Sequence, residues 1–430
     1  MKKYKFLLGV AVVAAVLTTS CVKPKDVSMS KETLEMRIGN IQQIIARQVT
    51  GTDIAEWSSS NEKVAIVFST SGDDALQTAD VIAMGEGKAT ITAKLGNKNV
   101  TCVVTVLKPN IYAVGYQTQG DKMVAVVWKD GVAQNLTDGT NDAAARSINI
   151  MDNEVFVVGF ENNDENISVA KLWRNGTAQN LSNGVNNASA VSVTVEVGYI
   201  GDIYAVGYSQ GATSLNAYGW RIGKTGGGLN SFMNITNGMA NNVFIPLNSS
   251  YSECYIAGRA LQADKFVPKL WKYQQVEQPL EISSQTGEAM SVYVWGEDVY
   301  VAGYEIDGDK LVAKTWKNGA VSNLTDGANN ACAMSIFVFA GDVYVAGYEE
   351  NASGKSVSKI WKNDSVLYTL SSGASNSSVS SLFVAGNDVF AAGYEENTNG
   401  IRVAKTWKNG VETALTDGTK NAVASTIVAY

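Results

Sequence analysis

Short apolar segments separated by turn residues make up most of the chain after its N-terminal region. In 85–96, for example, Ala89, Ile91 and Ala93 alternate with polar residues, as in a strand that buries one face. Helical heptads and long apolar periodic stretches are absent after the first 20 residues, and 40 glycines against 5 prolines favour many tight turns. The pattern predicts an all-β protein.

One apolar segment recurs seven times, at 111–116, 155–160, 203–208, 254–259, 299–304, 343–348 and 389–394. The eight residues DVYVAGYE at 298–305 return unchanged at 342–349. Each copy is followed by a tryptophan, and successive tryptophans lie 45 to 51 residues apart: Trp128, Trp173, Trp220, Trp271, Trp316, Trp361 and Trp407. The second part of the chain is therefore a repeat array.

A period near 45 residues with four short strands per unit (A to D) is typical of β-propeller blades. We expect strand B at 298–305, C at 311–316, D at 321–324 and an A strand at 332–339, with a positive-φ Asn-Gly turn in 317–319. The array starts at a strand B and ends with a lone strand A in 422–430. Residues 111–430 are therefore predicted to form a seven-bladed β-propeller, closed by pairing of the C-terminal strand with the first repeat.

The repeated tryptophans and glycines have a structural interpretation. Tryptophan would fill the wedge between blades, and glycine at positions such as 303, 347 and 393 would allow backbones to approach or bulge.

Residues 27–107 carry frequent turn residues and no helical period, which predicts a small β-sandwich. The segments AEWSSSNEKVAIV (55–67), with Trp57 in the core, GEGKATITAKLG (85–96) and CVVTV (102–106) make it resemble the bacterial immunoglobulin-like domain, group 2. That resemblance implies a spacer or adhesion module of cell-surface proteins. Residues 108–110 would be a linker to the propeller.

The first 20 residues combine a basic start, an apolar run too short to span a bilayer and small polar residues, as in a secretory signal. Because the segment ends on Cys21, it resembles a bacterial lipoprotein signal. The resemblance implies a lipid on Cys21, a short tether at 21–26 and a place in the cell envelope, at the outer membrane. The alternative is an ordinary cleaved signal followed by an unrelated cysteine.

The formal charge of −7 disfavours nucleic acid and anionic lipid as partners, leaving the lipid anchor as the expected membrane contact. The sequence has no histidine, which excludes Ser-His-Asp and Cys-His catalysis and imidazole metal sites. Cys102, Cys254 and Cys332 are expected to be buried free thiols, and no cofactor or metal is expected.

Acidic and basic residues change together among the repeats. Where strand B is followed by Glu, strand C carries Lys two residues before the tryptophan: Glu161 with Lys171, Glu305 with Lys314, Glu349 with Lys359 and Glu395 with Lys405. The first copy has Gln117 with Val126, the third has Ser209 with Tyr218, and only the fourth, Ala260 with Lys269, departs from the rule. We interpret these pairs as structural ion pairs across the B–C hairpin.

Candidate ligand residues lie in two places. The D–A loops would place Asn141, Asn186, Asn241, Asn329, Asn376 and Asn421 around one mouth of the central channel, although tight turns alone favour these residue types. The third and fourth repeats depart most from the pattern and carry Tyr218, Tyr251 and Tyr273.

The leading hypothesis is a non-catalytic, lipid-anchored binding or adhesion protein that recognises an extracellular or periplasmic glycan or an envelope protein. One alternative is a polysaccharide-acting hydrolase or lyase. Its carboxylate pair would have to come from acids outside the repeat pattern, such as Asp264, Glu281 and Glu288. Another alternative is a structural repeat protein of a surface assembly.

Overall fold

The computed structural model describes residues 27–49, 53–72, 76–196, 201–223, 228–246, 253–274, 276–280 and 282–430. Every regular element in these ranges is a β-strand, which confirms the all-β class. Within the same ranges there is accordingly no helix that could cross a membrane. The predicted signal segment 1–20, the tether 21–26 and Cys21 lie outside the described residues.

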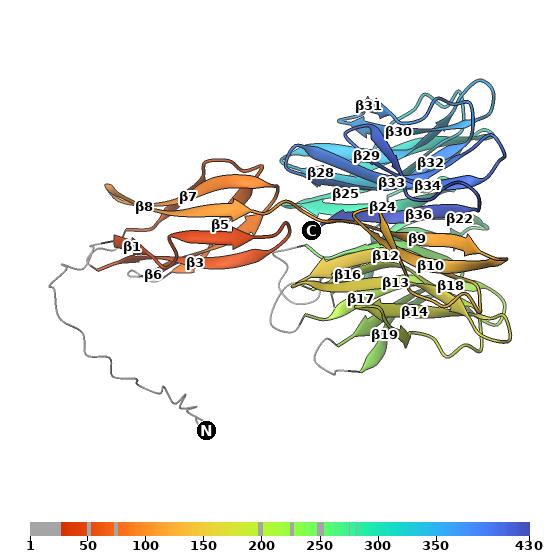
Figure 1. Cartoon of the computed structure of the whole chain (residues 1–430), viewed down its shortest axis with the longest axis horizontal. Coiled ribbons are helices and arrows are strands. Elements are labelled where there is room, and N and C mark those ends of the chain that lie inside the picture. Colours follow the sequence, from red (N-terminus) through yellow and green to blue (C-terminus); the bar gives the residue numbers. More distant parts are fainter. Residues whose placement is uncertain are drawn as a thin grey trace.

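Strands between residues 27 and 106 form two four-stranded sheets, at the left of Figure 1. The first sheet has the order β1 (Val27–Met29), β3 (Ile41–Gln48), β6 (Leu76–Ala83) and β5 (Ala65–Gly72). The second has the order β2 (Thr33–Met36), β8 (Lys98–Val106), β7 (Gly87–Leu95) and β4 (Glu56–Ser59). Both sheets bury apolar residues in one core, with Ile44 from the first and Ile91 from the second, and Trp57 packs against it. We call this part the sandwich.

The rest of the chain forms seven four-stranded antiparallel sheets among the described residues. The first sheet joins the end of the array to its start: β36 (Ala422–Ala429), β9 (Ile111–Gln119), β10 (Lys122–Lys129) and β11 (Val132–Asn135). The second is β12 (Ala143–Met151), β13 (Glu154–Asn162), β14 (Ser168–Arg174) and β15 (Thr177–Asn180). The third is β16 (Ala188–Val195), β17 (Ile203–Gln210), β18 (Leu215–Ile222) and β19 (Leu229–Ile235).

Four further sheets repeat this order. The fourth is β20 (Gly238–Phe244), β21 (Cys254–Gln262), β22 (Lys265–Gln274) and β23 (Val276–Leu280). The fifth is β24 (Gly287–Trp295), β25 (Asp298–Asp307), β26 (Lys310–Lys317) and β27 (Ala320–Asn323). The sixth is β28 (Ala331–Phe339), β29 (Asp342–Glu350), β30 (Ser356–Lys362) and β31 (Ser365–Thr369), and the seventh is β32 (Ser377–Ala385), β33 (Asp388–Glu396), β34 (Arg402–Lys408) and β35 (Val411–Ala414).

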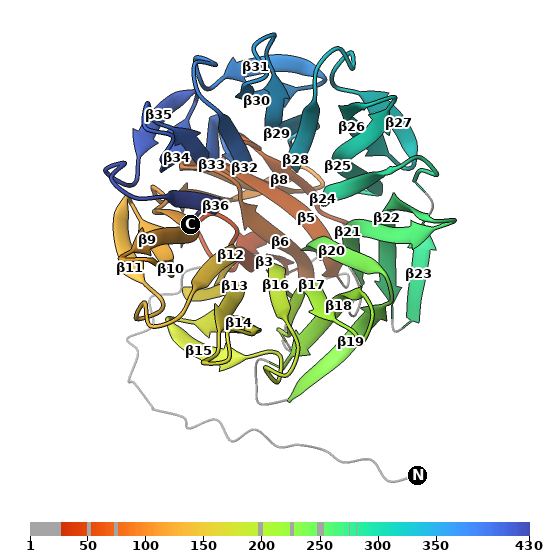
Figure 2. The ribbon, with the colours of Figure 1, turned by 90° about the vertical axis from the view of Figure 1, so that its right-hand side faces the viewer.

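The seven sheets radiate around a common axis, with one strand A of each sheet at the centre (Figure 2). Each central strand contacts the central strands of the two neighbouring sheets, and these contacts lead from β12 through β32 and β36 back to β12. The predicted pairing of the last strand with the first repeat is present: β36 runs antiparallel to β9, with Thr426 opposite Val114 and Val428 opposite Tyr112. We call residues 111–430 the ring.

Side chains on the central strands link each sheet to the next. Each central strand carries a bulge, and the residue after the bulged one is Ser, Thr or Asn. In six sheets its oxygen accepts a backbone N–H from the following sheet, at 2.9–3.4 Å: Ser147 from Val193, Ser192 from Val243, Asn242 from Val292, Ser291 from Ile336, Ser335 from Leu382 and Ser381 from Ile427. Thr426 Oγ1 donates to Arg146 O at 2.7 Å, which completes the circle.

The same bulges explain the repeated glycine of strand B. An added Cβ at Gly303 would lie 2.1 Å from Glu288 O, and one at Gly347 would lie 2.0 Å from Cys332 O. The equivalent distance is 1.9–2.1 Å at Gly115, Gly159, Gly207, Gly258 and Gly393. Glycine is therefore required by space, as the sequence predicts, because a neighbouring carbonyl occupies the place of a side chain.

The seven tryptophans fill the wedges between sheets. Each is at most 3% exposed and packs against residues of the preceding sheet, as Trp361 does against Ala302 and Ala313. Asn318 and Gly319, in the turn after Trp316, have φ of 51° and 83°, the conformation predicted for this hairpin. Cys102, Cys254 and Cys332 are buried free thiols, as expected.

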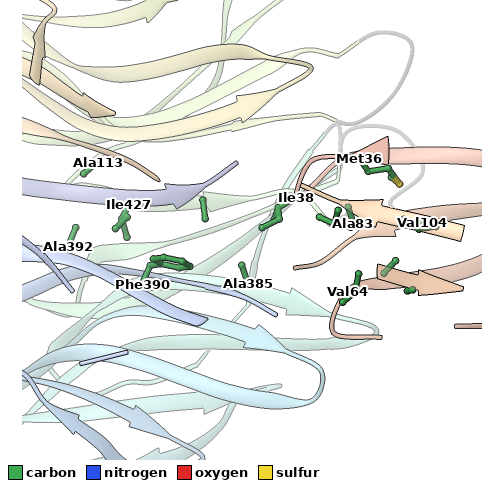
Figure 3. Close-up of a cluster of buried hydrophobic side chains, with 14 of the residues drawn as sticks. Met36, Ile38, Val64, Ala83, Val104, Ala113, Ala385, Phe390, Ala392 and Ile427 are labelled. Atoms are coloured by element: carbon green, nitrogen blue, oxygen red, sulfur yellow. The ribbon is translucent and has the colours of Figure 1, made fainter. Parts of the chain in front are cut away.

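The sandwich packs against one face of the ring, and its strands are visible behind the centre of the ring in Figure 2. Gly85 lies against Gly386, in the A–B turn of the seventh sheet, with no room for a Cβ between them. Lys63 Nζ donates to Asn387 Oδ1 at 2.8 Å. Ile38 and Val64 of the sandwich belong to the same buried cluster as Ala385 and Phe390 of the ring (Figure 3).

The position of the sandwich distinguishes the two ends of the ring. Because the strands of each sheet are antiparallel, the A–B and C–D turns point toward the sandwich, whereas the B–C and D–A loops lie at the opposite end. We call that opposite end the loop face.

Candidate functional site

The four predicted ion pairs are formed. Nζ–Oε2 distances are 2.8 Å for Lys171–Glu161, 3.2 Å for Lys314–Glu305 and 2.6 Å for Lys405–Glu395, and Lys359 pairs with Glu349. Burial lowers the pKa of Lys405, but hydrogen bonds to Glu395 and Glu412 outweigh that effect, and the net pKa is raised. Each pair ties strand B to strand C within one sheet.

Exchanging the two charges of one pair tests this role. The single variants Glu349→Lys and Lys359→Glu each place like charges together and are expected to lower the free energy of unfolding by about 1–3 kcal/mol. The double variant Glu349→Lys/Lys359→Glu restores the attraction and is expected to recover most of the loss in urea denaturation. Equal losses in all three variants would contradict the pairing.

The other three sheets replace the pair in different ways. In the first, Gln117 donates to Asn135 Oδ1 at 3.3 Å. In the fourth, Lys269 is 8% exposed and donates to Gln262 Oε1 at 2.8 Å. The third sheet places Ser209 and Tyr218 at these positions, so no charge remains there.

A second set of contacts was not predicted. The residue after each tryptophan is cationic, and its charged group lies 5.2–5.8 Å from the centre of a strand B aromatic ring: Lys129 over Tyr112, Arg174 over Phe156, Arg221 over Tyr204, Lys272 over Tyr255, Lys317 over Tyr300, Lys362 over Tyr344 and Lys408 over Phe390. In six sheets this cation also pairs with an acid near the start of strand B, as Lys317 does with Asp298 at 2.8 Å. The sequence contained a signal for these contacts, because the letters DVY in strand B and WK in strand C recur together among the repeats.

The acids that pair with these cations make a small contribution to the loss of folding stability at low pH. Hydrogen bonds from Lys317 and Asn318 lower the pKa of Asp298, and those from Lys362 and Asn363 lower the pKa of Asp342. A carboxyl whose folded pKa is depressed adds stability above its unfolded pKa and loses it as pH falls through the folded value. Because these carboxyls are exposed, solvent screens the contribution.

The D–A loops are held by their own hydrogen bonds, which supports the turn interpretation of their sequence. Thr137 Oγ1 accepts the N–H of Ala125 at 3.2 Å, and Asp138 Oδ1 accepts the N–H of Thr140 at 2.8 Å. The latter bond lowers the pKa of Asp138. Ser, Thr, Asp or Asn residues make equivalent bonds in the second, fifth, sixth and seventh sheets.

The six candidate asparagines do not form one ring around the channel, so that prediction is corrected. Asn376 and Asn421 accept strand C N–H groups of Ser356 and Arg402, at 3.3 and 2.9 Å, and so lie toward their own sheets. Asn141 donates to Asp164 at 3.3 Å, and Asn329 is half-buried in its loop. Apart from Asn241, the sequence motif joined residues at two successive loop positions, which have different surroundings.

Asn241 lies on strand β20 and not in a loop. It is 9% exposed and donates to Glu288 Oε1 at 2.8 Å. Glu288 also binds Arg259 Nη1 at 3.2 Å and accepts from the Tyr304 hydroxyl at 3.3 Å. Glu288 is therefore held in a buried network between the fourth and fifth sheets.

The remaining candidates are dispersed. Tyr273 packs edge-on against Phe232, with ring centres 5.0 Å apart, on the sandwich side of Trp271. Tyr251 and Glu281 lie outside the described residues, and Asp264 is in the β21–β22 hairpin turn. In the described part of the chain, no group of three acidic or cysteine side chains is placed to hold a metal ion.

Asn186 and Tyr218 are brought together in one groove. Its lining is Leu181, Ser182, Asn183 and Asn186 from the second sheet and its loop, with Ser209, Tyr218, Trp220 and Leu229 from the third sheet, and its volume is about 470 Å³. We call it the Tyr218 groove. Asn183, Asn186 and Ser209 of its lining lie at the loop face, whereas Leu229, opposite Ile222, lies toward the other end of the strands.

The groove lies where the third sheet has lost the Glu–Lys pair. Ser209 and Tyr218 take the places that Glu161 and Lys171 take in the second sheet. Tyr218 is half-buried, packs on the core between the two sheets and lies 5.0 Å from the Trp220 ring. Ser182 Oγ and Asn183 Oδ1 accept backbone N–H groups, which leaves the hydroxyl proton and the amide N–H₂ for a ligand.

Two other hollows have less suitable linings. A cavity of about 530 Å³ lies between β1 and β8 of the sandwich, and one of about 230 Å³ lies between the first and seventh sheets, lined by Trp128 and Phe390. Neither contains a candidate ligand residue from the sequence.

No protein-family model and no curated protein matches this sequence. Among solved structures, a protein of unknown function from Bacteroides thetaiotaomicron is 11% identical with a TM-score of 0.32, over 80% of this chain and 99% of that chain. Domains 5–6 of the S-layer protein SbsC are 15% identical with a TM-score of 0.19, over 49% and 96%. Domains 4–9 of SbsC are 10% identical with a TM-score of 0.19, over 92% and 83%. Likenesses this weak carry no conclusion about fold or function.

Proposed function

We propose that this chain is a non-catalytic, lipid-anchored cell-envelope protein that binds a glycan in the Tyr218 groove. In this proposal Cys21 carries the lipid, the sandwich is an immunoglobulin-like domain of group 2 that acts as a stalk, and the ring is a seven-bladed β-propeller. The seven bulged central strands, the β36–β9 pairing and the circle of hydrogen bonds that ends at Thr426 support the propeller.

The placement of the sandwich supports a recognition role for the loop face. The sandwich precedes the ring in the chain and packs on the face of the A–B turns. An anchor before residue 27 would therefore lie on the sandwich side, and the loop face would point away from it. Asn183, Asn186 and Ser209 of the Tyr218 groove lie at that loop face.

The observation that carries the proposal is the chemistry of the groove. The third-sheet wall carries Tyr218, Trp220 and Leu229 together with Ser209, and the second-sheet wall carries Ser182, Asn183 and Asn186 together with Leu181, so the first wall is mainly apolar and the second mainly polar. A pyranose has the same division, because C–H groups cover one face and hydroxyls project from its edge. The volume of the groove, about 470 Å³, lies within the range of about 300–1,000 Å³ that is usual for small-ligand pockets.

The enzyme alternative lacks comparable support. Glycosidases need two carboxyl groups about 5–10 Å apart on either side of the bond that breaks. The described residues that line the groove include no carboxyl group, and Glu288 is engaged by Asn241, Arg259 and Tyr304.

Rebuilding the ion pair in the third sheet tests the proposal. The variant Ser209→Glu/Tyr218→Lys copies the second sheet, so it should fold but fill the groove with a charged pair. In a glycan array followed by calorimetry, the wild-type chain is expected to bind and this variant to lose at least about tenfold in affinity. Glu349→Lys/Lys359→Glu, which changes the equivalent positions of the sixth sheet, is the control and should bind normally.

Two results would overturn the proposal. Binding that survives in Ser209→Glu/Tyr218→Lys would place the ligand elsewhere. No binding to any glycan on the array would remove glycan recognition and favour a structural role. Unfolding midpoints of both double variants show whether the fold is kept.

A further inference from the structure

We infer that the Tyr218 groove selects uncharged saccharides with a flat C–H face and discriminates against glycans that carry carboxylates or sulfates. This inference rests on the proposed function and specifies the ligand of the same site.

The first argument is the absence of charge from the described lining of the groove. None of the eight described residues that line it is charged, and Tyr218 is the only titratable side chain among them. In the second sheet, Lys171 occupies the position that Tyr218 occupies in the third, but its ammonium group is bound by Glu161 at 2.8 Å. A carboxylate or sulfate entering the groove would lose water without gaining a cation, and a buried anion without a partner is strongly disfavoured.

The second argument is the kind of hydrogen bond available. Hydroxyl and amide side chains both donate and accept, and so does a sugar hydroxyl. Asn186 and Ser209 thus match a neutral sugar edge with both donors and acceptors, and an anion, which uses donors alone, would face their acceptor atoms, whereas Ser182 and Asn183 supply donors only because their oxygens accept backbone N–H groups. The amide of Asn186 and the hydroxyl of Tyr218 make no hydrogen bond to any described residue, so both are available to a ligand.

The third argument is the apolar side. The Tyr218 ring lies 5.0 Å from the Trp220 ring, and Leu229, which is 40% exposed, lies farther along the same wall, opposite Ile222. An axial hydroxyl pressed against this surface would lose its hydrogen bonds to water without replacement. A saccharide face made only of C–H groups avoids that cost, which favours sugars with equatorial substituents.

The test uses matched pairs of tetrasaccharides, each neutral oligomer beside its uronate counterpart: β-1,4-glucose with β-1,4-glucuronate and α-1,4-galactose with α-1,4-galacturonate. Full-length protein is titrated with each by calorimetry. The neutral member is expected to bind at least about tenfold more tightly than its uronate, with the β-glucose oligomer the tighter of the two neutral ligands. Tyr218→Ala should abolish both interactions.

Asn186→Lys adds the missing cation and should improve uronate binding about tenfold while leaving the unfolding midpoint unchanged. Uronate binding as tight as neutral binding in the wild-type chain, lost in Tyr218→Ala, would overturn this inference and leave glycan binding at the groove intact. Failure of every oligomer, neutral and acidic, would contradict both.

Discussion

A chain that ends at Asn421 is expected to unfold at a midpoint on the order of 10 °C lower than the full chain, and to associate through the strand edge that it exposes. The missing segment 422–430 contains β36, which pairs with β9, and supplies five residues that are at most 6% exposed, namely Ala422, Ala424, Ile427, Ala429 and Tyr430. Ile427 is 1% exposed, and removing a buried isoleucine side chain alone costs about 2–5 kcal/mol. Without Thr426, the circle of hydrogen bonds between sheets is also broken.

Thermal unfolding and size-exclusion chromatography check this expectation. Lys420→Ala, which changes an exposed residue just before β36, is the control and should match the unchanged protein. The unfolding midpoint of Ile427→Ala should lie between those of the control and the truncated chain. A truncated chain that stays monomeric with an unchanged midpoint would show that the β36–β9 pairing does not hold the ring together.

Gly347→Ala is expected to destabilise the protein by about 3 kcal/mol or more, the upper end for added atoms in a packed interior. The new Cβ would lie 2.0 Å from Cys332 O, a backbone atom that cannot rotate away. Strands β28 and β29 would have to separate at the bulge between Ala333 and Ser335. The substitution adds one methyl group and removes none, so a large loss of stability would result from the close approach of the backbones and not from lost contacts.

Urea denaturation measures this effect. Gly228→Ala is the matched control, because a Cβ there meets no atom of the described residues within 4 Å. It should change the free energy of unfolding by less than about 0.5 kcal/mol, the usual limit for surface substitutions. If Gly347→Ala were as stable as Gly228→Ala, the steric explanation for the repeated glycine would be wrong.

Sequence reasoning succeeded where the interaction lies within one repeat. The four Glu–Lys pairs join neighbouring strands of a single hairpin, so their joint appearance, as in Glu349 with Lys359, was visible as a pattern along the chain. It failed for the asparagines. Asn241 and Asn376 occur in similar strings of letters, but one is buried beside Glu288 and the other is bonded to strand C. Asn376 directly precedes its strand A, whereas Asn241 lies four positions further on, in the bulge between Ala240 and Asn242, and the sequence alone does not show that offset.

The sequence by itself determined the number of repeats, their strands and turns, and the partner of the last strand, because these follow from local periodicity and from the strand missing at the start of the array. Only the tertiary structure decided what happens between sheets. Ser147 reaches Val193, and Ser381 reaches Ile427, across a separation of 46 residues in each case. The Tyr218 groove likewise needs two sheets placed side by side, since its walls come from different repeats. Contacts of this kind depend on the angle between packed sheets, which no single repeat encodes.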